Sequence, residues 1–184
     1  MNREFPRLET ERLLLRRPED ADIPLIINYA GNKSVAERTL NIPHPYAEKD
    51  ARFWIDSANE GFKNGTNIIF GIGLKPKNEF LGGIGLRIEP RFDRAELGYW
   101  IAEWFWNQGL ATEAVAAILN YGFNDLKLNK ILVTHLIENS ASGRVMTKNK
   151  MIKEGELKEH IKKNGVYQIL IQYRLTKKEF LTGS

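Results

Sequence analysis

The sequence has no cysteine among its 184 residues, and this absence excludes whole classes of chemistry. Disulfide bonds, a thiolate nucleophile and cysteine-ligated zinc all require a thiol. The histidines, His44, His135 and His160, are scattered without the spacing of metal ligands, so we expect no metal at the site. Neither a Ser/His/Asp order nor a paired-carboxylate spacing favours a hydrolase.

Long apolar runs and blocks of one charge are missing too. No run of about 18 apolar residues is present, and Met1 to Thr10 lack the apolar core of a signal peptide, so we expect a soluble cytoplasmic protein with no membrane partner. Lysine plus arginine (27) exceed aspartate plus glutamate (23) by 4, with the signs interleaved. This mild excess suits an anionic ligand. A nucleic-acid-binding module has only this charge in its favour, and we expect no nucleic acid partner.

What is present is typical of one globular domain. Apolar residues make up 42% of the chain and charged residues 27%, which is ordinary usage for a protein that buries a core. At roughly 100 to 200 residues per domain, the length predicts a single domain over residues 1–184.

The spacing of apolar residues predicts the order of elements. Asp22 is placed to cap a helix with Pro24 in its first turn, and Ser34 and Glu37 stand at capping-box spacing. Helical periodicity runs over Ala47–Lys63 and ends at a Gly cap. The pattern further predicts strands over Arg12–Arg17, Asn67–Lys75, Phe80–Ile88, Arg94–Ile101, Lys130–Ile137, Lys153–Ile161 and Val166–Leu175, with helices from Gly109 and over Ser142–Lys148.

This order indicates an α+β, or mixed α/β, structure with a largely antiparallel sheet. Asn164 and Gly165 are the strongest hairpin signal and join the last two strands. The unit from Arg94 to Ile137 is the exception, because a strand, a helix and a strand in succession require parallel neighbours.

The segment Trp104 to Thr112 joins a strand to a helix, where free backbone N–H groups and the helix dipole form an anion site. Gly109 and Ala111 leave the backbone bare enough for a pyrophosphate, and Asn107 and Gln108 add donors. The alternative is simple packing of small residues at a helix start. The segment lacks the lysine of a P-loop and the three glycines of a dinucleotide fingerprint, which disfavours ATP and NAD.

The pattern Trp106-x-x-Gly109-x-Ala111 resembles the pyrophosphate-binding loop of the GNAT superfamily of acetyl-CoA-dependent N-acetyltransferases. Thr112-Glu113-Ala114, the opening Leu8 to Arg16 and the strand Glu96 to Ile101 are similar to its RimJ/RimL-like branch, the ribosomal-protein N-terminal acetyltransferases. The resemblance covers nearly the whole chain. It implies a seven-stranded sheet splayed between the fourth and fifth strands, flanked by about four helices, with acetyl-CoA in the splay.

The resemblance also implies roles for individual residues. Glu96 would act as a base, often through water, and Ser142 would protonate the leaving thiolate. A backbone N–H near Trp100 to Ala102 would polarise the thioester. CoA contacts are implied for Trp100, Ile101, Ala102, Trp106, Asn107, Gln108, Gly109, Leu110, Ala111, Thr112, Asn139 and Lys148, and acceptor contacts for Pro43, Tyr46 and Tyr99.

Each role has a structural alternative. Glu96 is equally explained as a solvated or ion-paired carboxylate, Asn139 and Ser142 as helix caps, and Lys148 as an exposed helix lysine. Pro43 and Tyr46 alternatively only shape their loop, and most aromatic residues belong to the core. Many relatives have a tyrosine acid at the position of Met146 and Gly-Phe at Lys150-Met151, and this departure favours Ser142 or solvent as the acid.

The expected activity is direct attack of a primary amine on acetyl-CoA in a ternary complex, without an acyl-enzyme. The acceptor is a protein N-terminus or a small amine. The alternative is a CoA-binding sensor or scaffold without catalysis, which Met146 motivates. The protein is expected to be a monomer or a homodimer, with the closing hairpin as an edge for dimer contact.

Overall fold

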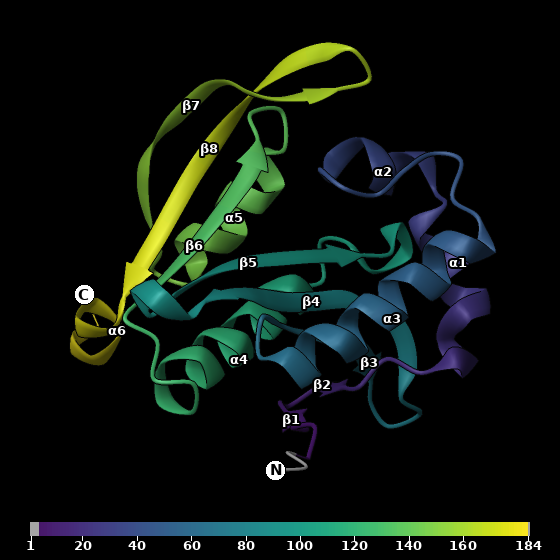
Figure 1. Cartoon of the computed structure of the whole chain (residues 1–184), viewed down its shortest axis with the longest axis horizontal. Helices are drawn as coiled ribbons and strands as arrows, with labels where there is room; N and C mark the ends of the chain where they lie inside the picture. The colour runs from purple at the N-terminus through teal and green to yellow at the C-terminus, as the bar shows by residue number, and fades with distance from the viewer. Residues whose placement is uncertain (1–3, 184) are drawn as a thin grey trace.

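The computed structural model describes residues 4–183 and contains one eight-stranded sheet with helices on both faces (Figure 1). The strands lie in the order β1-β2-β3-β4-β5-β6-β8-β7. They are β1 (Leu8–Glu9), β2 (Leu13–Arg16), β3 (Asn67–Leu74), β4 (Glu79–Glu89), β5 (Arg94–Ile101), β6 (Lys130–Leu136), β7 (Ile152–Lys163) and β8 (Val166–Thr176). The α-helices are α1 (Ile23–Ala30), α2 (Lys33–Arg38), α3 (Glu48–Asn64), α4 (Leu110–Asn124), α5 (Ser140–Lys148) and α6 (Lys177–Thr182).

Alternation along β5 divides the core into two clusters. Ala95, Leu97 and Ile101 belong to the larger cluster, together with the apolar side of α4. Trp100 joins the smaller cluster, with residues of α1 and α3. Because successive side chains of a strand point to opposite faces, α4 and α3 cover opposite faces of the sheet (Figure 1).

The sheet is split between β5 and β6, which are its parallel neighbours. Their pairing covers only Arg94 to Glu96 on β5 and Lys130 to Leu132 on β6. β5 continues to Ile101 along β4, whereas β6 pairs with β8 over its whole length. The two halves of the sheet therefore diverge, and β6, β8 and β7 rise away from β5 in Figure 1. Both the parallel crossover and the splay agree with the sequence expectations.

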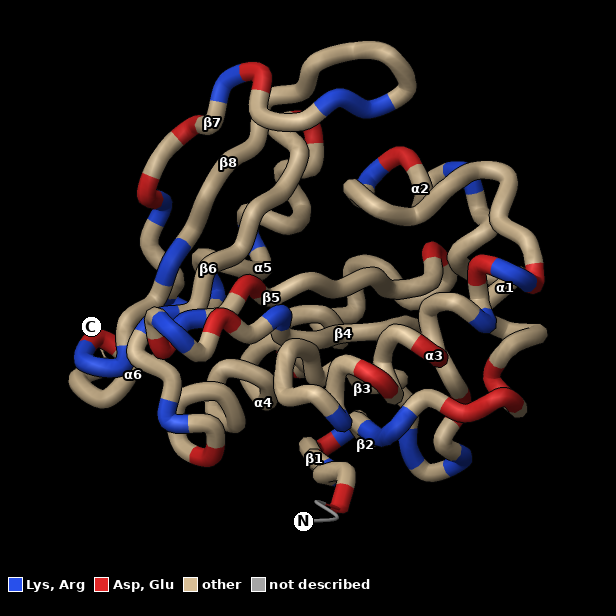
Figure 2. Tube along the Cα trace, viewed as in Figure 1, with Lys and Arg blue, Asp and Glu red and all other residues tan. Residues whose placement is uncertain are grey.

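β7 is an outer strand of the sheet and carries charges of both signs along its length (Figure 2). Its pairing with β8 contains register shifts near Gly155 and between Leu157 and Ile161. Charged side chains and bulges are features that hinder pairing of an outer strand with another chain.

Several turn predictions are confirmed. α3 ends at Gly65, whose φ of 71° is in the left-handed region that a helix C-terminal glycine adopts. The β7–β8 hairpin turns at Asn164 and Gly165, with φ values of 49° and 83°. Positive φ at both central residues is what a two-residue hairpin turn requires.

Other predictions are wrong in detail. The sheet has eight strands instead of seven, because the two-residue β1 pairs with β2. Asn32, and not Ser34, is the N-cap of α2, since its side chain accepts a hydrogen bond from the Ser34 backbone at 2.8 Å. α5 begins at Ser140 instead of Ser142, and the described residues also form α6, which the periodicity did not indicate.

α6 is stabilised by a capping box in which Glu179 accepts hydrogen bonds from Thr176. The Thr176 hydroxyl lies 2.6 Å and its backbone nitrogen 2.9 Å from the Glu179 carboxylate, which also pairs with Arg174. The bonds from Thr176, with the Arg174 pair, lower the pKa of Glu179 to about 2 from an ordinary value of 4.5. Because the folded-state pKa is the lower one, this stabilisation is complete above about pH 4.5 and is lost as pH falls toward about 2.

Replacing Glu179 with Gln is therefore expected to lower the melting temperature at pH 7 by a few degrees, and the difference from wild type should shrink between pH 5 and pH 3. Thermal melts followed by circular dichroism measure this. Glu60→Gln, at an exposed position of α3, is the control that should show no such trend. A difference for Glu179→Gln that stays constant over this range contradicts the assignment.

Candidate active site

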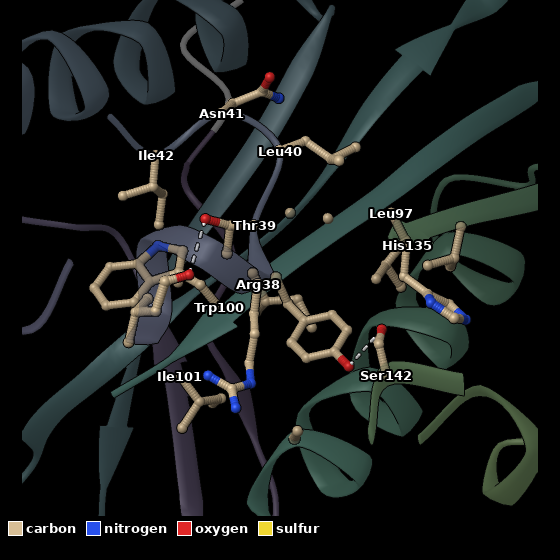
Figure 3. Close-up of a pocket in the computed structure, with 18 of the residues that line it drawn as sticks. Arg38, Thr39, Leu40, Asn41, Ile42, Leu97, Trp100, Ile101, His135 and Ser142 are labelled. Carbon is tan, nitrogen blue, oxygen red and sulfur yellow. Dashed lines mark hydrogen bonds between the residues drawn. The ribbon is translucent and has the colours of Figure 1, made fainter. Parts of the chain in front are cut away.

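A cavity of about 980 Å³ lies where β5 and β6 diverge. One side is formed by β5, β6, the turn before α4 and α5, and the other by α2, the segment 39–46 and α3. Figure 3 shows the side chains that project into it, with His135 and Ser142 at one end and Ile42 and Trp100 at the other. The cavity thus follows the split in the sheet.

The turn before α4 is folded so that the first helical turn faces this cavity. Asn107 and Gly109 both have left-handed backbones, with φ of 60° and 78°, and no side chain caps the helix at Gly109. The first N–H groups of a helix have no partner within the helix, so those of α4 are available to an anion. A Cβ at Gly109 would lie 3.5 Å from the nearest atom, a guanidinium nitrogen of Arg12.

Arg12, the residue before β2, holds this turn in place. Its guanidinium donates to the Gln108 carbonyl at 2.9 Å and pairs with Glu113 of α4 at 2.7 Å. The Trp106 indole N–H donates to the Ile101 carbonyl at 2.7 Å, which fixes the other end of the turn. The loop conformation is therefore held by side chains far apart in the sequence.

Most of the residues predicted to contact CoA line this cavity. Gln108 and Ala102 do not. The Gln108 side chain donates to the Trp104 carbonyl at 3.0 Å, and the buried Ala102 donates its N–H to the Leu81 carbonyl at 2.8 Å. Those that line the cavity are Trp100, Ile101, Trp106, Asn107, Gly109, Leu110, Ala111, Thr112, Asn139 and Lys148.

Tyr99 and Ser142 form a hydrogen-bonded pair across the split. The Tyr99 hydroxyl lies 3.0 Å from Ser142 Oγ, and both residues line the cavity. Burial raises the pKa of Tyr99, partly opposed by this hydrogen bond, so the phenol keeps its proton at neutral pH. When Tyr99 donates to it, Ser142 is free to donate its own hydroxyl proton to a third group.

Asn139 caps α5 with its side-chain oxygen, which lies 3.2 Å from the Ser142 nitrogen. Its side-chain nitrogen donates to the Arg38 carbonyl at 3.0 Å. The capping alternative for Asn139 is thus present in the structure. The amide nitrogen carries two hydrogens, so Asn139 can donate a second hydrogen bond besides this one.

Glu96 lies at the last parallel pair before the strands separate. Its carboxylate pairs with Arg87 of β4 and accepts a hydrogen bond from Thr134 of β6 at 3.1 Å. The ion-paired alternative for Glu96 is therefore present, and the same residue also lines the cavity.

Pro43 and Tyr46 line the far side of the cavity, in the segment between α2 and α3. Burial, together with the nearby Asp50 charge, raises the pKa of Tyr46 to about 12, so its hydroxyl is neutral. Lys163 of β7 holds the end of α2 and the first residue after it through backbone carbonyl groups. The Lys163 ammonium lies 2.7, 3.0 and 2.6 Å from the carbonyl oxygens of Ala36, Glu37 and Thr39.

Three residues near the cavity were not singled out from the sequence as site residues. Arg38 projects into the cavity from the end of α2 (Figure 3), with its guanidinium 4.7 Å from the centre of the Trp106 ring. His135 is buried and lines the cavity. Its Nδ1 lies 2.8 Å from the Leu136 carbonyl, and its Nε2 has no partner among the described residues. Lys163 precedes the Asn164-Gly165 turn, which was the only signal of its position.

Among residues 4–183, no group of His, Asp and Glu side chains is arranged to hold a metal ion. No helix within this part of the chain is both long and apolar enough to cross a membrane.

The fold and the cavity define a class of transferase. Residues 12–152 match the model of the acetyltransferase (GNAT) domain. The protein belongs to this family, and it is an N-acetyltransferase-type acyltransferase. The match contains both strands that diverge and the turn before α4.

Individual relatives agree with this assignment. An uncharacterized N-acetyltransferase, YoaA of Bacillus subtilis, is 32% identical over 162 residues, which cover 88% of this chain and 91% of that protein. The ribosomal-protein-serine acetyltransferase of Escherichia coli is 29% identical over 138 residues, 74% of this chain and 76% of that protein. The spermidine N-acetyltransferase of Vibrio cholerae, solved with CoA and spermine, shares the fold with a TM-score of 0.80 at 22% identity, over 94% of this chain and 99% of that one.

The Lys163 contacts predict a local effect of mutation. Lys163→Met removes the donor from three carbonyl groups, so residues 36–46 are expected to exchange amide hydrogens at least about tenfold faster, since each lost bond is worth about 1 kcal/mol. Hydrogen exchange read by mass spectrometry measures this. Lys162→Met is the control, because Lys162 only stacks over Tyr167, 5.4 Å from the ring centre. Equal exchange in both variants contradicts a clamping role for Lys163.

Proposed function

We propose that the protein is a cytoplasmic acetyl-CoA-dependent N-acetyltransferase, in which a primary amine attacks the thioester directly within a ternary complex. The observation that carries the proposal is the continuous cavity from the uncapped N-terminus of α4 to the gap between β5 and β6. One end suits a pyrophosphate and the other an acyl group between strands. The family membership and the CoA-bound fold neighbour support the same cosubstrate.

CoA would bind with its pyrophosphate at the amides that follow Asn107 and Gly109. Lys148, which lines the same cavity, would attract the phosphates, and Asn139 would donate its remaining amide hydrogen to the pantetheine arm. Without a cysteine in the chain, no thioester to the protein can form, and the acyl group would pass directly to the amine. The thioester bond breaks as the amide bond forms, and the ammonium proton leaves separately.

The strand register indicates which backbone N–H groups of β5 could polarise the thioester. In an antiparallel pair, N–H groups point alternately toward and away from the partner strand. The Ala102 N–H donates to Leu81 of the segment that pairs with β5, so by alternation the Trp100 N–H also faces β4. The N–H groups of Tyr99 and Ile101 then face the split, and we assign the oxyanion contact to these amides.

Glu96 would accept the proton of the incoming ammonium, through water, at the point where the strands separate. Arg87 and Thr134 hold its carboxylate in place. Ser142 would protonate the leaving thiolate, supported by the Tyr99 hydroxyl. Met146, which stands where many relatives have a tyrosine acid, is buried in the core and takes no part.

The acceptor is a protein N-terminus or a small amine; one named relative is a ribosomal-protein-serine acetyltransferase and one fold neighbour a spermidine N-acetyltransferase. We propose no nucleic acid or membrane partner, and either a monomer or a homodimer as the active form. The alternative function is a sensor that binds CoA without catalysis, and acetylation of any amine by the protein would exclude it.

The anion site is tested by Gly109→Arg, which fills the turn before α4. We expect CoA to bind about 10- to 100-fold more weakly, the loss of one or more charge-assisted hydrogen bonds, as measured by titration calorimetry. Gly65→Arg is the matched control, because Gly65 also has a left-handed backbone, with φ of 71°, and a Cβ added there meets nothing within 4 Å. Unchanged affinity in a folded Gly109→Arg protein contradicts the site.

The base role is tested by Glu96→Gln. Turnover is expected to fall by about 100-fold, within the range for a positioned general base, while CoA affinity stays within about twofold. Glu89→Gln is the control, since Glu89 forms a similar ion pair with Arg94, at 2.8 Å, outside the cavity. Equal rates for wild type and Glu96→Gln from pH 6 to pH 9 would remove Glu96 from the mechanism.

A further inference from the structure

The end of the cavity that lies over the α3 face of the sheet carries several apolar and aromatic side chains, beside the polar Asp50, Ser57 and Asn67. We call this end the aromatic bay, and its residues are Ile42, Tyr46, Phe53, Trp54, Gly98 and Trp100. Figure 3 draws Ile42 and Trp100 at this end, away from Ser142 and His135. Trp54 and Trp100 meet edge to face, with ring centres 6.3 Å apart.

Phe53 is the least expected member of the bay. It is 74% exposed although it belongs to an amphipathic helix, and it lines the cavity instead of packing in either core cluster. A large apolar side chain held in water at the rim of a cavity gains stability when a ligand covers it.

The floor of the bay is bare backbone. Gly98 of β5 pairs directly with Gly85 of β4, and both line the cavity. A Cβ built on Gly98 meets nothing within 4 Å, so the space above this residue is open. Glu96 and Trp100 flank Gly98 on the same face of β5, which places the open space between the proposed base and the aromatic wall.

The charges near the bay leave a single carboxylate, Asp50, for a second ammonium group. The carboxylates that line the cavity are Asp50 and Glu96. Asp50 accepts a hydrogen bond from the Ala47 backbone at 2.8 Å in the cap of α3, and Glu96 is paired with Arg87. A triamine such as spermidine brings two ammonium groups besides the attacking amine, and Asp50 can pair with only one of them, so the other would be a costly unpaired charge.

Building on the proposed function, we infer that the acceptor is a primary monoamine carrying an aromatic or branched aliphatic group, and that this group occupies the aromatic bay. The amine then lies over Gly98, beside Glu96, and the apolar group lies against Trp54, Trp100 and Phe53. A small arylalkylamine and a peptide with an aromatic first residue both present this chemistry.

The inference is tested by the rate of CoA thiol release at saturating acetyl-CoA, with phenethylamine, isoamylamine, spermidine and a tetrapeptide with an amino-terminal phenylalanine as acceptors. We expect kcat/KM for phenethylamine or the peptide to exceed that for spermidine by about 10- to 100-fold, the value of burying one large apolar group. The ratio of peptide to phenethylamine identifies which source the protein takes.

Two variants connect the preference to the bay. Phe53→Ala is expected to lower kcat/KM for phenethylamine by about fivefold or more, whereas Phe92→Ala, at a 55% exposed phenylalanine outside the cavity, should have no effect. Gly98→Val is compatible with the strand and should raise the KM for phenethylamine by at least about tenfold, with CoA affinity unchanged by calorimetry.

The outcomes separate the two proposals. Spermidine used as well as or better than phenethylamine, or monoamine kinetics untouched by Phe53→Ala and Gly98→Val, overturns the bay assignment while acetyl transfer stands. Tight CoA binding with no acetylation of any amine overturns both.

Discussion

The parallel pairing of β5 with β6 stops at Glu96, and the geometry of the site follows from this limit. A strand edge without a neighbour exposes N–H and C=O groups that must find other partners. Beyond Glu96 the Ile101 carbonyl is taken by the Trp106 indole, whereas the N–H groups on the same edge face a cavity. The separation therefore creates both the space for a ligand and the polar groups that can hold it.

The separation needs support from both sides. On one side β6 is paired along its whole length with β8, so it cannot close onto β5 without moving the C-terminal hairpin. On the other side Lys163 and Asn139 attach the end of α2 to the opposite half of the sheet through its carbonyl groups. These hydrogen bonds connect α2 with the far half of the sheet, while the space over Gly98 of β5 stays open.

Met146 stands where many relatives have a tyrosine acid, and the structure shows what surrounds this position. Met146 of α5 is fully buried, so the usual position for a proton donor is part of the core. A phenol is nevertheless present, because Tyr99 reaches across from β5 to Ser142. The hydroxyl that would face the thiolate is therefore that of Ser142, which accepts a hydrogen bond from Tyr99. The relative positions of these two groups depend on the angle between the diverging strands.

Local patterns in the sequence were sufficient for most elements, because strand and helix periodicity, the glycines at 65 and 165 and the Trp106-x-x-Gly109-x-Ala111 segment depend only on near neighbours. The same reasoning missed α6 and β1 and misplaced the cap of α2, where short elements carry too few residues for a period to appear. The contacts within the site could not be predicted from such local patterns. Tyr99 with Ser142, Arg12 with Gln108 and Lys163 with α2 join residues far apart in the chain. Sequence alone could name some of these residues, but only the crossover from β5 to β6 and the strand register decide which of them meet, since a contact between distant segments depends on how whole elements pack.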